Sequence, residues 1–220
     1  MTATEPAQRD LEGKIVDAAR DVIAAGGIEA LSMRAVAQRV GVSATALYHY
    51  FDGKQALVDR VVRGAFARFA AHMESAMERQ PPGSLERVRA LGEAYITFAL
   101  ENEAYFRVIF SIQLADPREL DDLPGGGGYH LLRRCVVDAM ASGAMRQADP
   151  DVVSLYVWSL VHGLVTLVLA CKVEGCVECA DPGLSPLDLF HGFAPFVREG
   201  LLGPGARTGD PDDNHGASSR

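Results

Sequence analysis

The sequence predicts an all-α protein of about nine helices, and three observations support this fold class. Apolar residues recur at helical spacing along most of the chain, whereas the alternation typical of strands is sparse. Glycine, proline, serine and aspartate interrupt these runs at the places where helices begin and end. The 220 residues are 48% hydrophobic, so the chain is able to bury a substantial core.

The first helix is expected from about Arg9 to Ala25, after a frayed arm at residues 1–8. Its apolar stripe consists of Leu11, Ile15, Ala18 and Val22. Gly26-Gly27 ends the helix. Ile28 and Leu31 are then expected to anchor the following segment to this helix, which would support that segment.

Residues 32–54 are the most informative part of the chain. Ser32 and Ser43 are suited to cap two short helices, because a serine hydroxyl accepts a hydrogen bond from an unpaired N–H of the first turn. The apolar face of the first helix consists of Met33, Val36, Ala37 and Val40. Gly41 is able to end that helix at positive φ, and a second helix is expected from Ala44 to about Tyr50. Its inward residues are Leu47 and Phe51. Two short helices joined by a glycine-containing turn are typical of a helix-turn-helix.

The outward residues of the second helix favour DNA binding over a generic helical bundle with a polar face. Its start is small or polar, which allows close approach to base edges in a major groove. These residues are Ser43, Ala44 and Thr45. Its end and the next turn carry donors suited to phosphate oxygens, namely Tyr48, His49, Tyr50 and Lys54. The generic bundle explains the core positions but not these donors.

From Gly41 to Phe51 the chain reads Gly-Val-Ser-Ala-Thr-Ala-Leu-Tyr-His-Tyr-Phe, followed by Lys54 and Leu57 and preceded by Ser-Met-Arg at 32–34. This pattern resembles the DNA-binding domain of the TetR family of transcriptional regulators over about residues 9–60. The resemblance implies DNA contacts from Ser43, Thr45, Tyr48, His49, Tyr50 and Lys54, assisted by Ser32 and Arg34. Ala44 stands where many relatives have a basic or larger residue, so its expected role is apolar contact with a thymine methyl.

The expected domains are a DNA-binding domain at residues 1–55 and an effector-binding and dimerisation domain at 56–202. A tail at 203–220, rich in glycine, proline, aspartate and serine, is expected to be disordered. The net charge of −8 argues against indiscriminate coating of nucleic acid. Residues 32–54 nevertheless hold three positive side chains and one negative one. We therefore expect local binding, in which a homodimer presents two modest patches to a palindromic operator of double-stranded DNA.

Beyond the helix-turn-helix, further helices follow from start and stop signals such as Ser84, Asp149-Pro150-Asp151 and Ser185-Pro186. The expected ranges are 54–78, 84–101, 104–114, 129–142, 150–173 and 185–202. Residues 116–128 are acidic and then glycine-rich, so a mobile loop is expected there. Helix 104–114 is expected to turn Phe106, Ile109 and Phe110 to one side.

The stretch from Trp158 to Gly163 reads Trp-Ser-Leu-Val-His-Gly and resembles the Trp-His-Gly signature of one class of TetR-family C-terminal domains. In that class the last two long helices pair with those of a second subunit, so the resemblance implies a homodimer. Aromatic and histidine side chains of helices 84–101, 104–114 and 150–173 are candidates to contact a small apolar or aromatic effector, although plain core packing is the alternative. The candidates are Tyr95, Phe98, Phe106, Phe110, Trp158 and His162.

Two other readings compete for the C-terminal half. Residues 152–171 lack charged side chains for a length that would span a bilayer, which permits a membrane-tethered helical protein. Ser154, Ser159, Thr166 and the missing basic flank favour a buried helix instead. Cys171, Cys176 and Cys179 permit a metal or thiol-redox sensor, but their spacing lacks the paired motifs of a structural zinc site.

The chain shows no sequence signature of an enzyme: no phosphate-binding glycine loop before a helix, no HExxH and no nucleophile elbow. No cofactor and no metal are expected, and the polar N-terminus without an apolar core segment predicts a cytoplasmic protein. The sequence therefore predicts a DNA-binding regulator that responds to a small effector, more in keeping with a repressor than with an activator.

Overall fold

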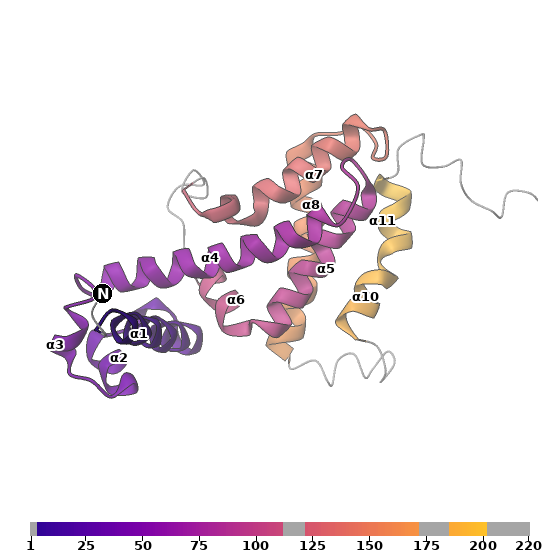
Figure 1. Cartoon of the computed structure of the whole chain (residues 1–220). Coiled ribbons are helices and arrows are strands. Elements are labelled where there is room, and N and C mark those ends of the chain that lie inside the picture. The colour runs from indigo at the N-terminus through magenta and orange to yellow at the C-terminus, as the bar shows by residue number, and fades with distance from the viewer. Residues whose placement is uncertain (1–3, 112–121, 172–184, 202–220) are drawn as a thin grey trace, which may run out of the picture. The chain divides into compact units, whose positions relative to one another are not determined.

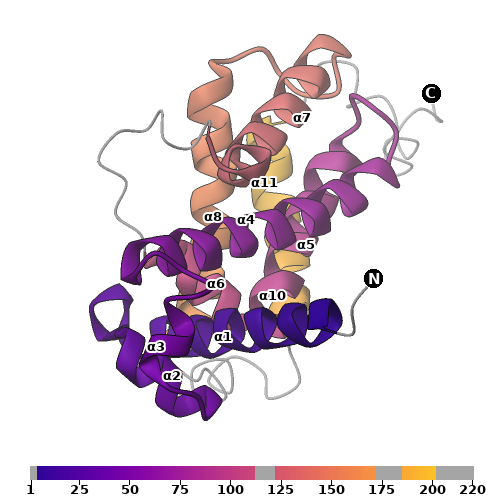
Figure 2. The ribbon, with the colours of Figure 1, turned by 60° about the vertical axis from the view of Figure 1, so that its left-hand side comes forward.

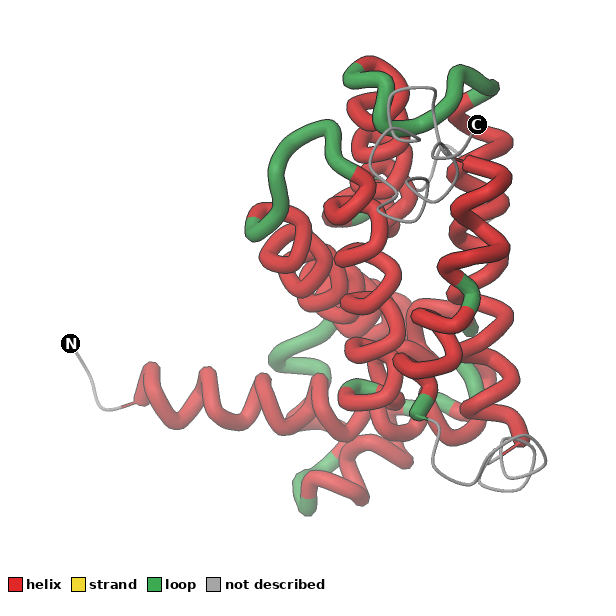
Figure 3. The backbone as a smooth tube through the Cα atoms, turned by 90° about the vertical axis from the view of Figure 1, so that its right-hand side faces the viewer, coloured by secondary structure: helices red, strands yellow, loops and turns green. Residues whose placement is uncertain are grey.

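The computed structural model of the chain describes residues 4–111, 122–171 and 185–201. Within these ranges every regular element is a helix, and the connections are turns and loops (Figure 3). The all-α fold class predicted from the sequence is confirmed.

The chain divides into two compact units. Unit 1 contains Met1–His72 and Thr97–Gly128, and unit 2 contains Met73–Ile96 and Tyr129–Arg220. The division falls inside two helices, α4 (Lys54–Glu78) and α5 (Leu85–Glu101), because both are continuous through the residues where the units meet in sequence. The domain boundary at residue 55 stays a prediction.

Unit 1 opens with α1 (Thr4–Gly26), which begins five residues before the expected start at Arg9. The frayed arm was therefore a wrong prediction for residues 4–8. Pro6 lies in the first turn, where its missing N–H costs the helix nothing. The buried stripe is also rotated slightly, because Leu11 and Val22 are only half-buried. The buried residues are Ile15, Ala18, Ala19 and Ile23.

Next come the short elements η1 (Ile28–Ala30), α2 (Met33–Val40) and α3 (Ala44–Leu47), which gather near α1 (Figure 1). The α-helical part of α3 ends at Leu47, not at Tyr50 as expected. His49 and Tyr50 donate their N–H groups to the carbonyls of Ala46 and Leu47, at 3.3 and 3.0 Å, in a tighter three-residue turn. Aromatic and histidine residues favour the helix less than alanine does, which explains the early end.

Unit 1 also contains the first part of α4, which has the expected bounds, together with α6 (Glu103–Phe110) and η3 (Pro124–Gly128). α6 starts one residue early and ends at Phe110, short of the expected Leu114; residues 112–121 lie outside the described ranges. The glycine run forms η3, whereas a loop was expected. Gly128 has φ of 86°, and an added Cβ there would collide with the ring of Phe69, so glycine permits this close packing.

Unit 2 is built from the end of α4, most of α5, α7 (Tyr129–Ala141) and α8 (Pro150–Cys171). α7 and α8 are packed side by side (Figure 2). The carboxylate of Asp149 caps α8 by accepting from the N–H of Asp151 at 2.9 Å, as the start signal predicts. The final predicted helix is in fact two, α10 (Pro186–Gly192) and α11 (Ala194–Leu201). Pro195 explains the break, because its ring crowds the carbonyl four residues earlier and it donates no N–H.

Candidate nucleic-acid interface

Side-chain caps fix the starts of α2 and α3. The Ser32 hydroxyl accepts from the N–H of Ala35 at 3.1 Å, and the Ser43 hydroxyl accepts from the N–H of Ala46 at 3.2 Å. Gly41 ends α2 in the left-handed region at φ of 79°, and its N–H donates to the carbonyl of Ala37 at 2.9 Å. Each of these features was predicted, and together they hold the two helices at a defined angle.

A small apolar core lies beneath the two helices. Leu47 is fully buried, and Phe51 is buried just after the turn that follows α3. The α2 side of this core consists of Met33, Val36 and Ala37. Val40, the fourth residue of the predicted face, is only half-buried, because it lies at the end of α2 beside the turn. The packing fixes which residues of α3 face outward.

The nine predicted DNA contacts lie on three segments: the start of α2, α3 with its following turn, and the first residue of α4. Six of these side chains are exposed at the start of α2, along α3 and in the turn after it, and Tyr48 has 56% of its surface exposed. The exposed residues are Ser32, Arg34, Ser43, Thr45, Tyr48 and His49, and the half-buried ones are Ala44, Tyr50 and Lys54. Their contact with DNA stays a prediction.

The two capping serines each keep a hydrogen-bond donor in this arrangement. In each cap the hydroxyl oxygen accepts a hydrogen bond, which leaves the O–H of Ser32 or Ser43 as a donor. A phosphate oxygen is an acceptor, so capping and phosphate contact are compatible on the same side chain.

Two further exposed side chains of α2, Gln38 and Arg39, lie outside the predicted set of DNA contacts. Gln38 stands four residues after Arg34 and therefore lies on the same face of the helix. Arg39 is the basic residue of the last turn of α2. The helical spacing from Arg34 was the signal that would have identified Gln38.

Three of the six candidate effector residues meet in unit 2. The Tyr95 hydroxyl lies 2.8 Å from Nδ1 of His162, and Nε1 of Trp158 donates to the same hydroxyl at 3.4 Å. Because tryptophan only donates, the Tyr95 oxygen accepts from it and the phenol proton is available to His162. Burial raises the pKa of Tyr95 well above its usual range, and burial lowers the pKa of His162. Both groups are therefore neutral near pH 7.

The other three candidates lie in unit 1. Phe98 is 1% exposed and packs edge-on against Phe69, with ring centroids 5.1 Å apart. The rings of Phe106 and Phe110 are 4.6 Å apart. Phe106 is buried, whereas Phe110, the last residue of α6, is 37% exposed.

The cysteine cluster cannot be placed, since Cys176 and Cys179 lie outside the described residues. Within the part of the chain that the structure describes, no group of three or more histidine, cysteine, aspartate or glutamate side chains is arranged to hold a metal ion. Cys135 of α7 is buried, and burial raises the pKa of its thiol.

α8 has one face inside unit 2 and one face that the described residues leave uncovered. Val153, Val161 and Val165 are buried, whereas apolar side chains at helical spacing on another face are exposed. The exposed ones are Val152, Leu155, Tyr156 and Leu167. By length and composition α8 is also the one described helix that is long and apolar enough to cross a membrane. Within its most apolar 18 residues, 28% are buried. Its packing against α7 and α10 is what a helix of a helical bundle shows.

Two protein-family models match the chain. "Bacterial regulatory proteins, tetR family" matches residues 15–61, which contain the helix-turn-helix. "Tetracyclin repressor-like, C-terminal domain" matches residues 88–182, which contain most of α5 and all of α7 and α8. Together the two matches cover more than half of the chain. The finer resemblance to the Trp-His-Gly class stays a prediction.

Curated relatives agree with the first match. The chain is 31% identical over 93 residues to the uncharacterized HTH-type transcriptional regulator YobS of Bacillus subtilis, covering 42% of this chain and 47% of that protein. It is 39% identical over 70 residues to the HTH-type transcriptional repressor KstR of Mycolicibacterium smegmatis, covering 32% and 34%. The chain thus spans about half or less of the length of the curated relatives it matches.

Solved structures share the fold over most of the chain. A protein of unknown function from Rhodococcus sp. RHA1 has a TM-score of 0.68 and 24% identity, covering 87% of this chain and 95% of that one. The regulator FadR from Bacillus subtilis in complex with stearoyl-CoA has a TM-score of 0.64 and 15% identity, covering 84% and 96%. With the two family matches and the capped helix-turn-helix, these likenesses lead to one conclusion. The chain belongs to the tetR family of bacterial regulatory proteins.

Proposed function

We propose that this protein is a sequence-specific DNA-binding transcriptional repressor that a small effector releases from its operator. One observation carries the proposal: two short helices are capped by Ser32 and Ser43, and the second helix with the turn after it exposes Thr45, Tyr48 and His49 above an apolar base. Such a helix fits a major groove, and the donors around it fit phosphates. The proposal includes a cytoplasmic location and no enzymatic activity.

A homodimer is part of the proposal, because one reading head, by which we mean the helix-turn-helix at residues 32–54, carries little positive charge. The net charge of −8 opposes non-specific binding, so affinity has to come from two heads acting together on two half-sites. The heads of a symmetric dimer would contact half-sites roughly one or more DNA turns (~34 Å) apart. The expected operator is palindromic.

The uncovered apolar face of α8 supports this dimer. Val152 and Leu155 are 65% and 55% exposed in the single chain, and Leu167 is 61% exposed near the other end of the helix. Leaving such side chains in water is unfavourable by about 25 cal/mol for each Å². A second copy of α8 would cover them symmetrically, as expected for a homodimer. Membrane insertion of α8 is the competing explanation of the same face.

For the effector we propose an apolar or aromatic small molecule contacted by Tyr95, Trp158 and His162. These side chains offer aromatic surface and a few neutral polar groups, which is the usual lining of a small-molecule site. An effector that favours the DNA-free form by ~1–3 kcal/mol would lower operator affinity by roughly 5- to 150-fold.

The test is a gel shift of the purified protein on the DNA upstream of its own gene, at fixed salt and with unrelated DNA as competitor. We expect a discrete, competitor-resistant complex that the double variant Arg34→Ala with Tyr48→Ala loses. Arg107→Ala serves as the matched control, because Arg107 is exposed on α6 and pairs with Glu103 of its own helix. If a selection of bound fragments from the whole genome also yields no preferred sequence, the proposal is wrong.

The effector is tested on the same complex. Stearoyl-CoA, the molecule named for the FadR structure, is a practical first probe, followed by aromatic compounds. An effector should release the DNA, and Trp158→Leu should weaken that release without weakening operator binding. Release that is unchanged in Trp158→Leu and in His162→Asn would show that the effector binds elsewhere.

Sedimentation of the protein with membranes in a cell extract would instead support the membrane reading of α8.

A further inference from the structure

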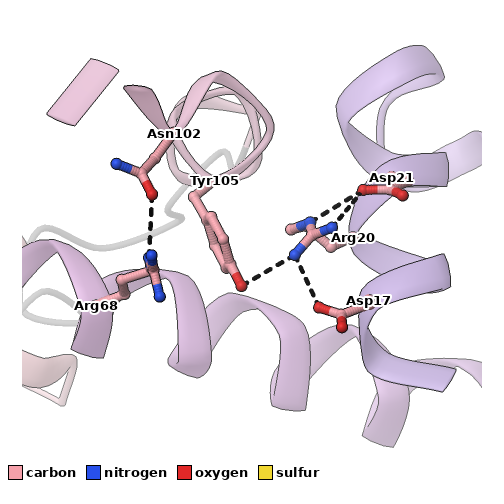
Figure 4. A network of polar contacts seen from close by, with 6 residues as sticks. All are labelled: Asp17, Arg20, Asp21, Arg68, Asn102 and Tyr105. Atoms are coloured by element: carbon pink, nitrogen blue, oxygen red, sulfur yellow. Dashed lines mark hydrogen bonds and ion pairs between the residues drawn. The ribbon is translucent and has the colours of Figure 1, made fainter. Parts of the chain in front are cut away.

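α1 is held by a helix that lies far outside the predicted DNA-binding domain. It packs on α2 and η1, as the helix-turn-helix requires, and also on α6, which belongs to the same compact unit. Three helices meet at one tyrosine of α6, Tyr105, which lies between Arg20 of α1 and Arg68 of α4 (Figure 4).

Arg20 is fixed on the α1 side by its own helix. Its Nη1 donates to Asp17 at 2.8 Å, and its Nε and Nη2 donate to Asp21 at 3.0 and 2.7 Å. The same Nη1 donates to the Tyr105 hydroxyl at 3.0 Å, and the guanidinium carbon lies 4.7 Å from the centroid of the Tyr105 ring. The Arg20 side chain is only 19% exposed, so its contact with the ring is partly shielded from water.

Arg68 approaches the same ring from α4, with its guanidinium carbon 5.2 Å from the centroid. Its Nε donates to Oδ1 of Asn102 at 3.1 Å. Asn102 stands at the N-cap of α6, but its side chain makes no capping bond to that helix. An oxygen that would ordinarily cap α6 therefore ties the start of α6 to α4.

We propose that Tyr105 is a positioning residue for DNA binding, which fixes α1 through Arg20 against α4 and thereby sets the orientation of α3. This inference rests on the proposed function. α1 carries the base of the reading head, and α4 begins at Lys54, a predicted phosphate contact. A ring that contacts both helices at once defines the angle between them, which neither helix-turn-helix cap does.

The neighbouring ion pair shows what an ordinary surface contact on α6 looks like. Arg107 binds Glu103 at 2.7 Å within α6, and both side chains are about half exposed. That pair connects no second element, so its loss should leave α1 in place. Arg107→Gln is therefore the matched control for a change at Tyr105.

The experiment measures operator affinity, salt dependence and amide hydrogen exchange for Tyr105→Leu, Tyr105→Phe, Arg20→Gln and the double variant Arg20→Gln with Tyr105→Leu. Thermal unfolding first confirms that each variant is folded. We expect Tyr105→Leu to weaken operator binding about tenfold, Tyr105→Phe less because it keeps the ring, and the double variant no more than the worse single change. The salt slope should stay that of the wild type, since no phosphate contact is removed.

Hydrogen exchange separates positioning from stability. Exchange should rise in α1 of Tyr105→Leu but not in α7, and Arg107→Gln should match the wild type in every readout. Unchanged operator affinity in folded Tyr105→Leu would overturn the proposal and leave Tyr105 a stabilising residue only. If the wild type itself binds no DNA, the proposed function fails. In that case unchanged exchange in α1 would show that the ring does not hold α1 either.

Discussion

The molecule exposes two helical surfaces of opposite chemistry, one on α2 and α3 and one on α8. The first is small and polar, with the hydroxyl of Thr45 and the ring of His49 in solvent. The second is apolar, with Leu155 and Leu167 each more than half exposed. Water is an acceptable partner for the polar surface until a phosphate replaces it, whereas it is a poor partner for leucine.

This difference indicates what each surface is for. A polar surface on a rigid base is stable alone and is suited to a partner that comes and goes, as DNA does. An apolar helical face is suited to a partner that stays, because its exposure is unfavourable whenever the partner is absent. We therefore assign reversible DNA binding to α3 and lasting dimerisation to α8. The following predictions test that assignment.

The largest effect is expected from charges on the apolar face of α8. Leu155→Glu combined with Leu167→Glu should produce a folded monomer, because both side chains are exposed in the single chain but buried in the proposed dimer. Operator affinity should fall by about 100-fold or more, since two linked heads bind far better than one. Light scattering on a sizing column measures the mass. Val137→Glu, at a 37% exposed position of α7, is the control and should stay dimeric.

A smaller effect is expected on the polar surface at Lys54, the first residue of α4. Lys54→Ala should weaken binding to specific and unrelated DNA alike and flatten the salt slope by about one ion per subunit. Fluorescence anisotropy at several salt concentrations measures both. A changed sequence preference with an unchanged salt slope would place Lys54 at a base and not at a phosphate.

Loss of one cap should affect the stability of the reading head. Ser43→Ala removes the acceptor for the Ala46 N–H and should cost about 1 kcal/mol of unfolding free energy. Ser43→Asp restores an acceptor but adds a negative charge beside the DNA. We expect it to regain stability and still bind DNA poorly, as measured by chemical denaturation and anisotropy. Recovery of both properties would argue against a phosphate near Ser43.

The smallest effect is expected on the pH dependence of stability when His162 of α8, which is hydrogen-bonded to Tyr95, is replaced. Burial lowers the pKa of His162 from its ordinary 6.5. The imidazole therefore takes up a proton less readily in the folded state than in the unfolded state. Its contribution to stability is present above pH 6.5 and is lost as the pH falls from there through the folded pKa. Thermal unfolding against pH should therefore be flatter in His162→Asn. His191→Asn, at an exposed histidine paired with Glu93, serves as the control for a general histidine effect.

Local signals in the sequence predicted much of this structure. Capping serines, a glycine at positive φ and proline after an aspartate are short-range devices, and they placed the starts of α2, α3, α5 and α8 correctly. The buried residues of α4 and α5 also recur at helical spacing, because one face of each helix is apolar.

The features that the sequence did not predict depend on contacts between distant residues or on a balance of weak helix preferences. Arg20 and Tyr105 are 85 positions apart, so no local pattern shows that they meet. The early end of α3 and the break before α11 were missed because apolar periodicity continues through both. The nine DNA contacts were predicted from their outward positions and by resemblance to a family, and the six effector candidates from their aromatic and histidine side chains.

The central claim is that two copies of this chain bind one palindromic site through α3. A footprint on the bound upstream DNA, combined with the mass of the complex in sedimentation, tests it most directly. We predict two chains for each DNA and two protected half-sites, related by a dyad and centred about one or more helical turns (~34 Å) apart. A single asymmetric protected stretch with one chain bound would contradict both the dimer through α8 and the recognition of a palindromic site through α2 and α3.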